Sequence, residues 1–314
     1  MDSKTVQKLL KIVLFTVVIS YALDKLVFFS LNKISDEVMT GQAIGKLNQF
    51  LSNKDSTEFF VFGNSRANHH IDMSLFKQKG YNMGIDGTGI AYSSTLISTL
   101  PQHKKQLIIV HVDTKNFFDS LYDGGDMRAL KSKYQRNPNI TEALKKNNQL
   151  SSLQSFYYSM NYNGNAIGIL KNYFKPSYNY KEYNGYDPLY VSKSQESIRD
   201  MVLAKSMTSD CLDNYIINAK ALKYLKSIKI FSEQNPEKTF IFLTSPIHND
   251  ICDEDNKKLH LLMEELGLNY KDFSNLYKNS NSNTYWKDRT HMSDKGAEAF
   301  SKHLINTYNE FEYP

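Results

Sequence analysis

The feature that most constrains this chain is a run of four bulky apolar residues, Phe59-Phe60-Val61-Phe62, which stops at Gly63-Asn64-Ser65. Such a run suits a strand that is buried on both faces of a parallel sheet. The turn after the run then lies at the carboxyl end of the strand, where open α/β sheets form their ligand crevice. A serine at that place is a candidate nucleophile if a base reaches it.

Apolar runs alternate with helical patterns along the rest of the chain. Further strands are expected to begin at Tyr81, Leu107, Thr239 and Asn269. Helices are expected over 73–79, 91–100, 211–231, 259–266 and 298–308. Strands that alternate with helices in this way predict a three-layer α/β/α architecture with a mostly parallel sheet.

The first 31 residues predict a membrane segment. Three lysines among residues 1–11 precede an apolar run over 12–23, and a second run follows Asp24 and Lys25. Together the runs reach the length of about 20 residues that a span needs, with Lys25 snorkelling at the outer end. No small-residue cleavage site follows, which disfavours a signal peptide, and a buried soluble helix is a third interpretation. We favour an uncleaved signal-anchor over 1–31, which exports the remainder of the chain.

The remainder divides into a linker and one large domain. Spaced apolar residues over 32–58 predict an amphipathic linker helix. Residues 59–314 are expected to form the α/β domain. Within it, residues 120–209 are rich in Asn, Tyr, Lys and Ser and predict a helical and loop insertion, of the kind that often carries specificity.

Composition limits the classes of partner. The net charge of +5 is spread thinly without a dense basic block, which argues against nucleic-acid binding. Cys211 and Cys252 have no zinc-site spacing; they form either one disulfide or two buried thiols. We find no metal motif and no nucleotide-binding loop, so no cofactor is expected.

A serine nucleophile requires an imidazole base, which is usually held by a carboxylate. Asp288 precedes His291 by three residues, a spacing that lets both side chains reach one point. The other histidines invite simpler interpretations. His69 and His70 are expected to be polar turn residues. Solvent-facing helical positions are expected for His103, His260 and His303.

Three segments in this order resemble the SGNH (GDSL-like) hydrolase superfamily, and in particular its membrane-anchored bacterial envelope branch. The segments are Gly63-Asn64-Ser65, residues 82–87, and Trp286 to Ser293. The resemblance covers roughly residues 59–116 and 239–305. It implies a flavodoxin-like SGNH hydrolase fold, and a chain whose bulk lies in the bacterial periplasm or at the cell surface.

The resemblance also assigns roles. Ser65 would be the nucleophile, His291 its base, and Asp288 the residue that orients His291. The backbone N–H groups of Ser65 and Gly87 would contribute to the oxyanion hole. The superfamily adds an asparagine from a Gly-x-Asn-Asp turn, whereas this chain reads Asp113-Thr114-Lys115-Asn116, so Asn116 stands one position late.

Two functions follow as expectations. The first is a serine esterase or O-acyltransferase that acts on acyl groups, chiefly acetyl, of an envelope or secreted glycan. Its partners would be a glycan or small acyl ester, the membrane, and for a transferase an acyl-donor membrane protein. The second is a catalytically degenerate glycan-binding or assembly subunit. A lipid or thioester hydrolase is a third alternative, for which the 120–209 insertion is rather polar.

Overall fold

The computed structural model describes residues 2–205, 211–278, 280 and 282–308. The chain forms two compact units. Unit 1 consists of residues 1–48 and 128–178, and unit 2 consists of residues 49–127 and 179–314.

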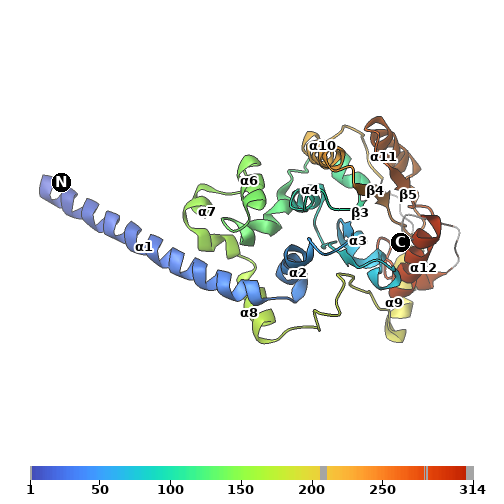
Figure 1. Ribbon diagram of the computed structural model, residues 1–314, viewed down its shortest axis with the longest axis horizontal. Coiled ribbons are helices and arrows are strands. Elements are labelled where there is room, and N and C mark those ends of the chain that lie inside the picture. Colours follow the sequence, from blue (N-terminus) through green and yellow to red (C-terminus); the bar gives the residue numbers. More distant parts are fainter. Residues whose placement is uncertain (1, 206–210, 279, 281, 309–314) are drawn as a thin grey trace. The chain divides into compact units, whose positions relative to one another are not determined.

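Unit 2 is built on a five-stranded parallel sheet, shown in Figure 1. Its strands are β1 (Phe59–Phe62), β2 (Gly80–Asn82), β3 (Gln106–His111), β4 (Lys238–Thr244) and β5 (Tyr270–Asp272). Their spatial order is β2-β1-β3-β4-β5. This order confirms the predicted α/β class, and it is a doubly wound order whose switch point lies between β1 and β3. The carboxyl ends of these two strands therefore mark where a ligand crevice is expected.

The apolar strands are buried because helices cover both faces of the sheet. Phe59 and Val61 share a core with residues of α3 (Ser65–His70) and α12 (Asp294–Thr307). The alternate side chains Phe60 and Phe62 pack on Phe50 of α2 (Lys46–Asn53). This arrangement agrees with the three-layer architecture expected from the sequence. The other helices of unit 2 are η2 (Met73–Leu75), α4 (Ile90–Ile97), α5 (Thr114–Phe118), α9 (Lys193–Ala204), α10 (Ala219–Gln234), α11 (Asp253–Glu265) and η5 (Asn283–Tyr285).

Two predicted helices are shorter in the structure. The helix expected over 73–79 is only the 3-10 turn η2. The helix expected over 211–231 begins at Ala219. Cys211 is tied to Cys252, and Leu212 N and Tyr215 OH donate to Asp255 instead of continuing a helix. Apolar spacing alone does not reveal such side-chain attachments.

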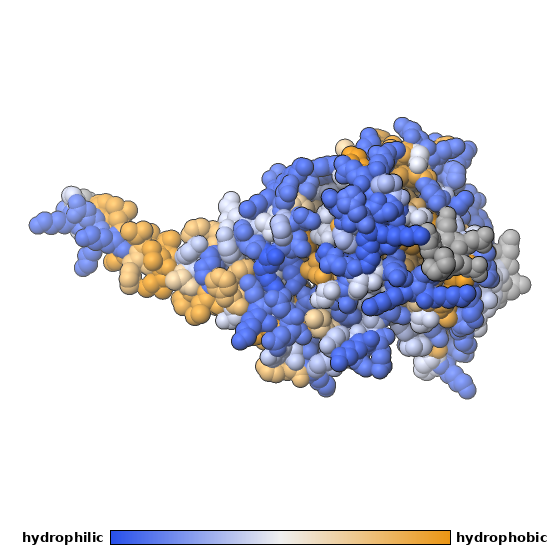
Figure 2. Space-filling model, in the orientation of Figure 1, coloured by the Kyte–Doolittle hydropathy of each residue, from blue (hydrophilic) through white to orange (hydrophobic). Residues whose placement is uncertain are grey.

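Unit 1 is helical in its described residues. Its longest element is α1 (Ser3–Glu37), which is long and apolar enough to cross a membrane. Figure 2 shows the apolar side chains exposed along α1. The carboxyl end of α1 packs into a small core that includes Phe28, Val38, Tyr162 and Ile169. The other elements are η1 (Gly41–Gly45), η3 (Gly125–Lys133, which begins in unit 2), α6 (Pro138–Lys146), α7 (Ser152–Phe156), η4 (Tyr158–Tyr162) and α8 (Ala166–Phe174).

The predicted linker and the predicted insertion are each divided among several elements. Residues 32–58 contain the end of α1, then η1 and α2. Of the predicted insertion, residues 120–205 contribute helices and turns to both units, and the part over 128–178 belongs with α1 in unit 1; residues 206–209 lie outside the described residues.

Candidate active site

Ser65 is the first residue of α3, directly after the turn that ends β1. Gly63 has φ +152°, and a Cβ at this position would lie 2.7 Å from the Cβ of His111 and 2.8 Å from that of Ala67. Glycine therefore lets the end of β1 approach the end of β3. Asn64 caps α3 by accepting a hydrogen bond from the N–H of Arg66 (3.0 Å). The turn thus presents Ser65 at the switch point of the sheet.

The structure brings Ser65 together with the two residues predicted to activate it. Ser65 Oγ lies 2.8 Å from His291 Nε2, and His291 Nδ1 lies 3.0 and 3.1 Å from the two carboxylate oxygens of Asp288. An ionised carboxylate can only accept hydrogen bonds, so Nδ1 carries the imidazole proton. His291 Nε2 then accepts the Ser65 hydroxyl proton, which is the arrangement required of a general base.

Asp288 remains ionised because of its local hydrogen bonds. Burial would raise the pKa of its carboxyl. The hydrogen bond and charge of His291, together with the backbone N–H groups of Thr290 and His291, outweigh burial and lower the pKa to about 2. Asp288 thus keeps its charge over the whole range in which an imidazole can act as a base.

The loop that carries His291 is closed by backbone pairing. Trp286 and Met292 form an antiparallel bridge, and Lys287 N donates to His291 O (3.0 Å). Trp286 and Met292 are both buried in the core that contains α12. His291 is therefore held on a fixed loop even though its imidazole is partly exposed.

A buried polar network lies behind the triad. The N–H of Met292 donates to His70 Nε2 (3.0 Å), so the proton of this neutral imidazole is on Nδ1, which faces Ser245 Oγ at 2.8 Å. Ser245 Oγ lies 3.0 Å from His111 Nε2. Burial, and then the charge of Arg66, lower the pKa of His70 well below its ordinary value and that of His111 to about 3. Both imidazoles are therefore neutral at physiological pH.

His69 and His70 are not the polar turn residues that were expected. Both are buried within α3, because one face of this short helix packs against the sheet and the His291 loop. His69 Nδ1 faces the carbonyl of Asp187 (2.6 Å), and its Nε2 faces Asp86 (3.1 Å). Its ring meets that of His291 edge to face at 5.7 Å.

The three histidines that were expected at solvent-facing helical positions differ from one another. His103 is exposed as expected, but it lies in a turn with φ +56° and not on a helix. His260 is exposed on α11, whereas His303 on α12 is only partly exposed.

An ion pair joins the ends of β1 and β3. Arg66 is almost fully buried, pairs with Asp113 (Nη1 to Oδ2, 3.3 Å) and donates to the carbonyl of Ser245. The charge of Arg66 helps to lower the pKa of Asp113 against the opposing effect of burial. No motif in the sequence singles out Arg66, His111 or Ser245 as a site residue. Their positions at the carboxyl ends of β1, β3 and β4 were the available signal.

Of the residues proposed for the oxyanion hole, Gly87 lies in a loop held beside the Ser65 turn, whereas the side chain of Asn116 packs elsewhere. Gly63 O accepts hydrogen bonds from Ile85 N (3.1 Å) and Thr88 Oγ1 (3.2 Å), which holds the loop of Gly87 beside the nucleophile turn. Gly87 has φ +72°, a conformation that glycine adopts readily. Asn116 lies on α5, and its Oδ1 would be 2.6 Å from a Cβ built at Gly89. Its amide therefore packs against the start of α4.

A small cavity of about 220 Å³ opens beside Ser65 and His291. The residues that line it are Asn64, Ser65, Arg66, Asp113, Thr114, Lys115, Ile247, Asp250, Cys252, Asp255, Asn256, Thr290 and His291. Most of these side chains can donate or accept hydrogen bonds.

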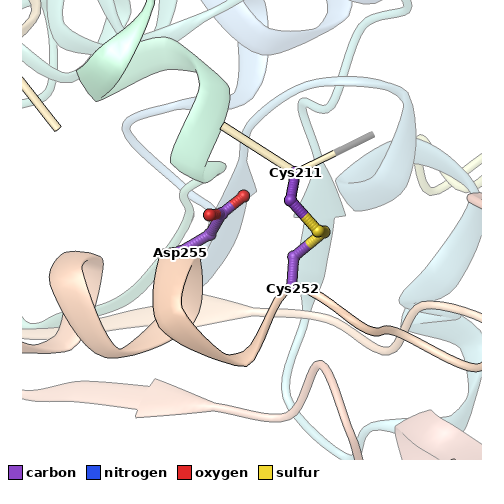
Figure 3. Close-up of side chains that lie close together, drawn as sticks. All are labelled: Cys211, Cys252 and Asp255. Carbon is purple, nitrogen blue, oxygen red and sulfur yellow. A yellow bond between two sulfur atoms is a disulfide. The ribbon is translucent and has the colours of Figure 1, made fainter. Parts of the chain in front are cut away.

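One wall of this cavity contains a disulfide between Cys211 and Cys252, which decides between the two options left by the sequence. Figure 3 shows the carboxylate of Asp255 beside it. Among the residues that the structure describes, these three form the cluster with metal-ligand side chains. The sulfurs are bonded to each other, however, and Asp255 accepts from Leu212 N (3.0 Å) and Tyr215 OH (2.8 Å). The cluster therefore fastens the 211–215 segment to α11.

Comparison with protein-family models and with curated proteins finds no match for this chain. The SGNH resemblance therefore rests on the motifs quoted above.

The neutral histidines behind the triad predict acid sensitivity. Unfolded His70 and His111 would bind protons below about pH 6.5, whereas the folded residues would not, so stability falls as the pH drops below that value. Each contributes up to about 1.4 kcal/mol per pH unit. His69 offsets part of this loss, because its hydrogen bonds to Asp86 and Asp187 raise its pKa despite burial.

The measurement is urea unfolding followed by the fluorescence of Trp286 at pH 7 and pH 5. His111→Gln should be less stable at pH 7 but lose less stability between the two pH values. The exposed His103→Gln should behave like the wild type. An unchanged pH slope in His111→Gln would contradict the prediction.

Proposed function

We propose that this chain is an exported, membrane-anchored serine esterase or O-acyltransferase of the SGNH type, which acts on acyl groups of an envelope or secreted glycan. The observation that carries the proposal is the continuous hydrogen-bonded series from Ser65 Oγ through His291 to Asp288, at 2.8 and 3.0 Å. These distances are within the reach required for proton transfer in acyl chemistry.

The reaction would proceed in two steps. Ser65 Oγ attacks the ester carbonyl while His291 Nε2 takes its proton, and the N–H groups of Ser65 and Gly87 stabilise the oxyanion. The bond to the leaving alcohol breaks as His291 returns the proton to it, which leaves an acyl-Ser65. Water or a sugar hydroxyl then attacks the acyl carbon, gives its proton to His291, and restores Ser65.

The cavity supports a small acyl group and a polar substrate. Its volume of about 220 Å³ and its carboxylate and amide lining suit the hydroxyl groups of a sugar better than a long acyl chain. This favours the glycan hypothesis over a lipid or thioester hydrolase.

Two observations support anchoring with the bulk outside the cytoplasm. The carboxyl end of α1 is part of the core of unit 1, which favours a retained helix over a cleaved signal peptide. The Cys211–Cys252 disulfide fits an oxidising compartment.

The second candidate function is a binding subunit without turnover. Asn116 favours it, because its side chain packs against Gly89 at the start of α4. In this case Ser65 would not be a reactive nucleophile.

A fluorophosphonate probe distinguishes the two functions. In an active enzyme, Ser65 Oγ displaces fluoride from phosphorus, and we expect stoichiometric labelling of the detergent-solubilised full chain. Labelling should be absent in Ser65→Ala and unchanged in Ser74→Ala, an exposed serine outside the site. A wild-type protein that stays unlabelled would favour the binding subunit.

A further inference from the structure

The charged pair that interrupts the apolar run of α1 is held inside unit 1. The buried carboxylate of Asp24 accepts from the N–H groups of Tyr158 (2.8 Å) and Ser159 (2.9 Å) and from Ser159 Oγ (2.5 Å). Lys25 Nζ donates to Asp24 (2.9 Å) and to the carbonyl of Phe156 (2.8 Å), and lies 3.3 Å from the centre of the Tyr158 ring. The turn between α7 and η4 therefore satisfies both charges, so Lys25 does not have to snorkel.

An apolar groove lies next to this turn, on the side toward the amino terminus of α1. Its volume is about 380 Å³, and it is lined by Val17, Val18 and Tyr21 of α1 and by Ser155, Phe156 and Tyr158. The rings of Tyr21 and Phe156 lie 4.9 Å apart, and Ser20 Oγ lies 2.9 Å from Tyr157 OH. The groove thus lies between α7 and α1. The other faces of α1 expose large apolar side chains.

The length of α1 fixes the depth of the groove. A hydrocarbon core of about 30 Å needs about 20 helical residues. A span that begins after Lys4 ends near Asp24, and one that begins after Lys11 ends near Leu31. Because α1 rises about 1.5 Å per residue, Ser20 lies at least about 6 Å below the membrane boundary in either case. If α1 spans the membrane, the groove would therefore lie within the lipid layer.

The surface beside the groove has the composition of a membrane interface. Leu153 is 58% exposed, Phe156 44% and Met160 37%, and Tyr157 and Tyr158 lie among them. Tyrosine rings are enriched at the boundary between lipid and water. Unit 1 also holds 14 Lys or Arg against 5 Asp or Glu, whereas the rest of the chain holds 24 against 28. Such a basic unit is attracted to anionic lipid headgroups.

We propose that α7 and the α7–η4 turn are embedded in the membrane boundary, and that the groove between α1 and α7 binds the acyl chain of a bilayer phospholipid. The groove is apolar, lies at hydrocarbon depth, and continues the lipid-facing surface of α1. A lipid chain fills the groove while the hydrogen bonds and ring contacts around it are kept. This site is independent of the triad and of the reaction catalysed there.

Brominated lipids test the proposal in the full chain. The protein is reconstituted at one copy per nanodisc, in anionic phospholipids with or without bromine on the acyl chains. Trp286, the single tryptophan, is buried in unit 2, and its emission with and without bromine is measured in the wild type and subtracted. Phe156→Trp adds an indole at the groove, and we expect bromine to remove more than about half of this added emission.

Phe174→Trp is the matched control. Phe174 is 79% exposed on α8, and Asn172 of the same helix accepts a hydrogen bond from Thr40, beyond the end of α1. From Lys25 to Glu37, α1 rises about 18 Å, so an indole at 174 should escape the bromine. An unquenched Phe156→Trp would overturn the proposal. Equal quenching at both positions would also overturn it, because the boundary would not lie at the α7–η4 turn.

Discussion

Replacing Ser65 or His291 with alanine is expected to lower kcat/KM for an aryl acetate by about 10⁴-fold or more. Without Ser65 no acyl-enzyme forms, and without His291 the hydroxyl keeps its proton, because Nε2 at 2.8 Å is the base within reach. The two losses should be nearly equal, and the double variant should be no worse than either single one, since the residues act as a unit.

Asp288→Asn should retain the fold but lose about 10³- to 10⁴-fold, because an amide can favour the wrong imidazole tautomer. His103→Ala, at an exposed histidine outside the site, should leave the rate unchanged. Thermal melting of each variant separates lost chemistry from lost folding. Substantial turnover in folded Ser65→Ala or His291→Ala would refute the assigned roles.

The second large effect concerns the disulfide. The cross-link closes a loop with a sequence separation of 41, which by loop entropy corresponds to about 4 kcal/mol of stability. Replacing Cys211 and Cys252 together with serine should therefore lower the melting temperature of unit 2 by roughly 10 °C. Trp286 fluorescence follows this transition.

The effect on activity should be distinct from the effect on stability. Cys252 lines the cavity beside Ser65, and without the disulfide the 211–215 segment would be held by its hydrogen bonds to Asp255 and by the ring contact of Tyr215 with Phe118. We expect KM to rise while the rate of fluorophosphonate labelling stays close to that of the wild type. Dithiothreitol should reproduce the shift in the wild type and have no effect on the double variant. An unchanged melting temperature would contradict the prediction.

The sequence predicts the sheet well because its strands are apolar on both faces. The runs at Phe59, Leu107 and Thr239 each became a buried strand. Asp288 and His291 stand together because they are three residues apart in a loop that turns back on itself, with Lys287 N and Asp288 N both donating to His291 O. Short-range spacing carries this information.

The features of the fold and of the site that the sequence did not predict depend on contacts between segments far apart in the chain. His70 looks like a turn residue until Met292 and Ser245 are placed beside it. The helix expected from Cys211 fails because a disulfide and Asp255 hold its first residues elsewhere. The role of residues 128–178 could not be predicted, because their partner is α1, which lies far earlier in the sequence; the contact of Tyr158 with Asp24, for example, joins residues 134 positions apart.

The short helix α3 touches the same loop at both of its ends. Ser65 Oγ at its start meets His291 Nε2, and His70 Nε2 at its end receives the N–H of Met292. About one and a half turns of helix separate Ser65 from His70, so the length of α3 fixes how these two side chains meet the His291 loop. An insertion or deletion of a single residue within α3 would rotate one end by about 100° relative to the other, so that only one of the two contacts could survive. Natural variants of this chain should tolerate substitutions in α3 far better than any change in its length.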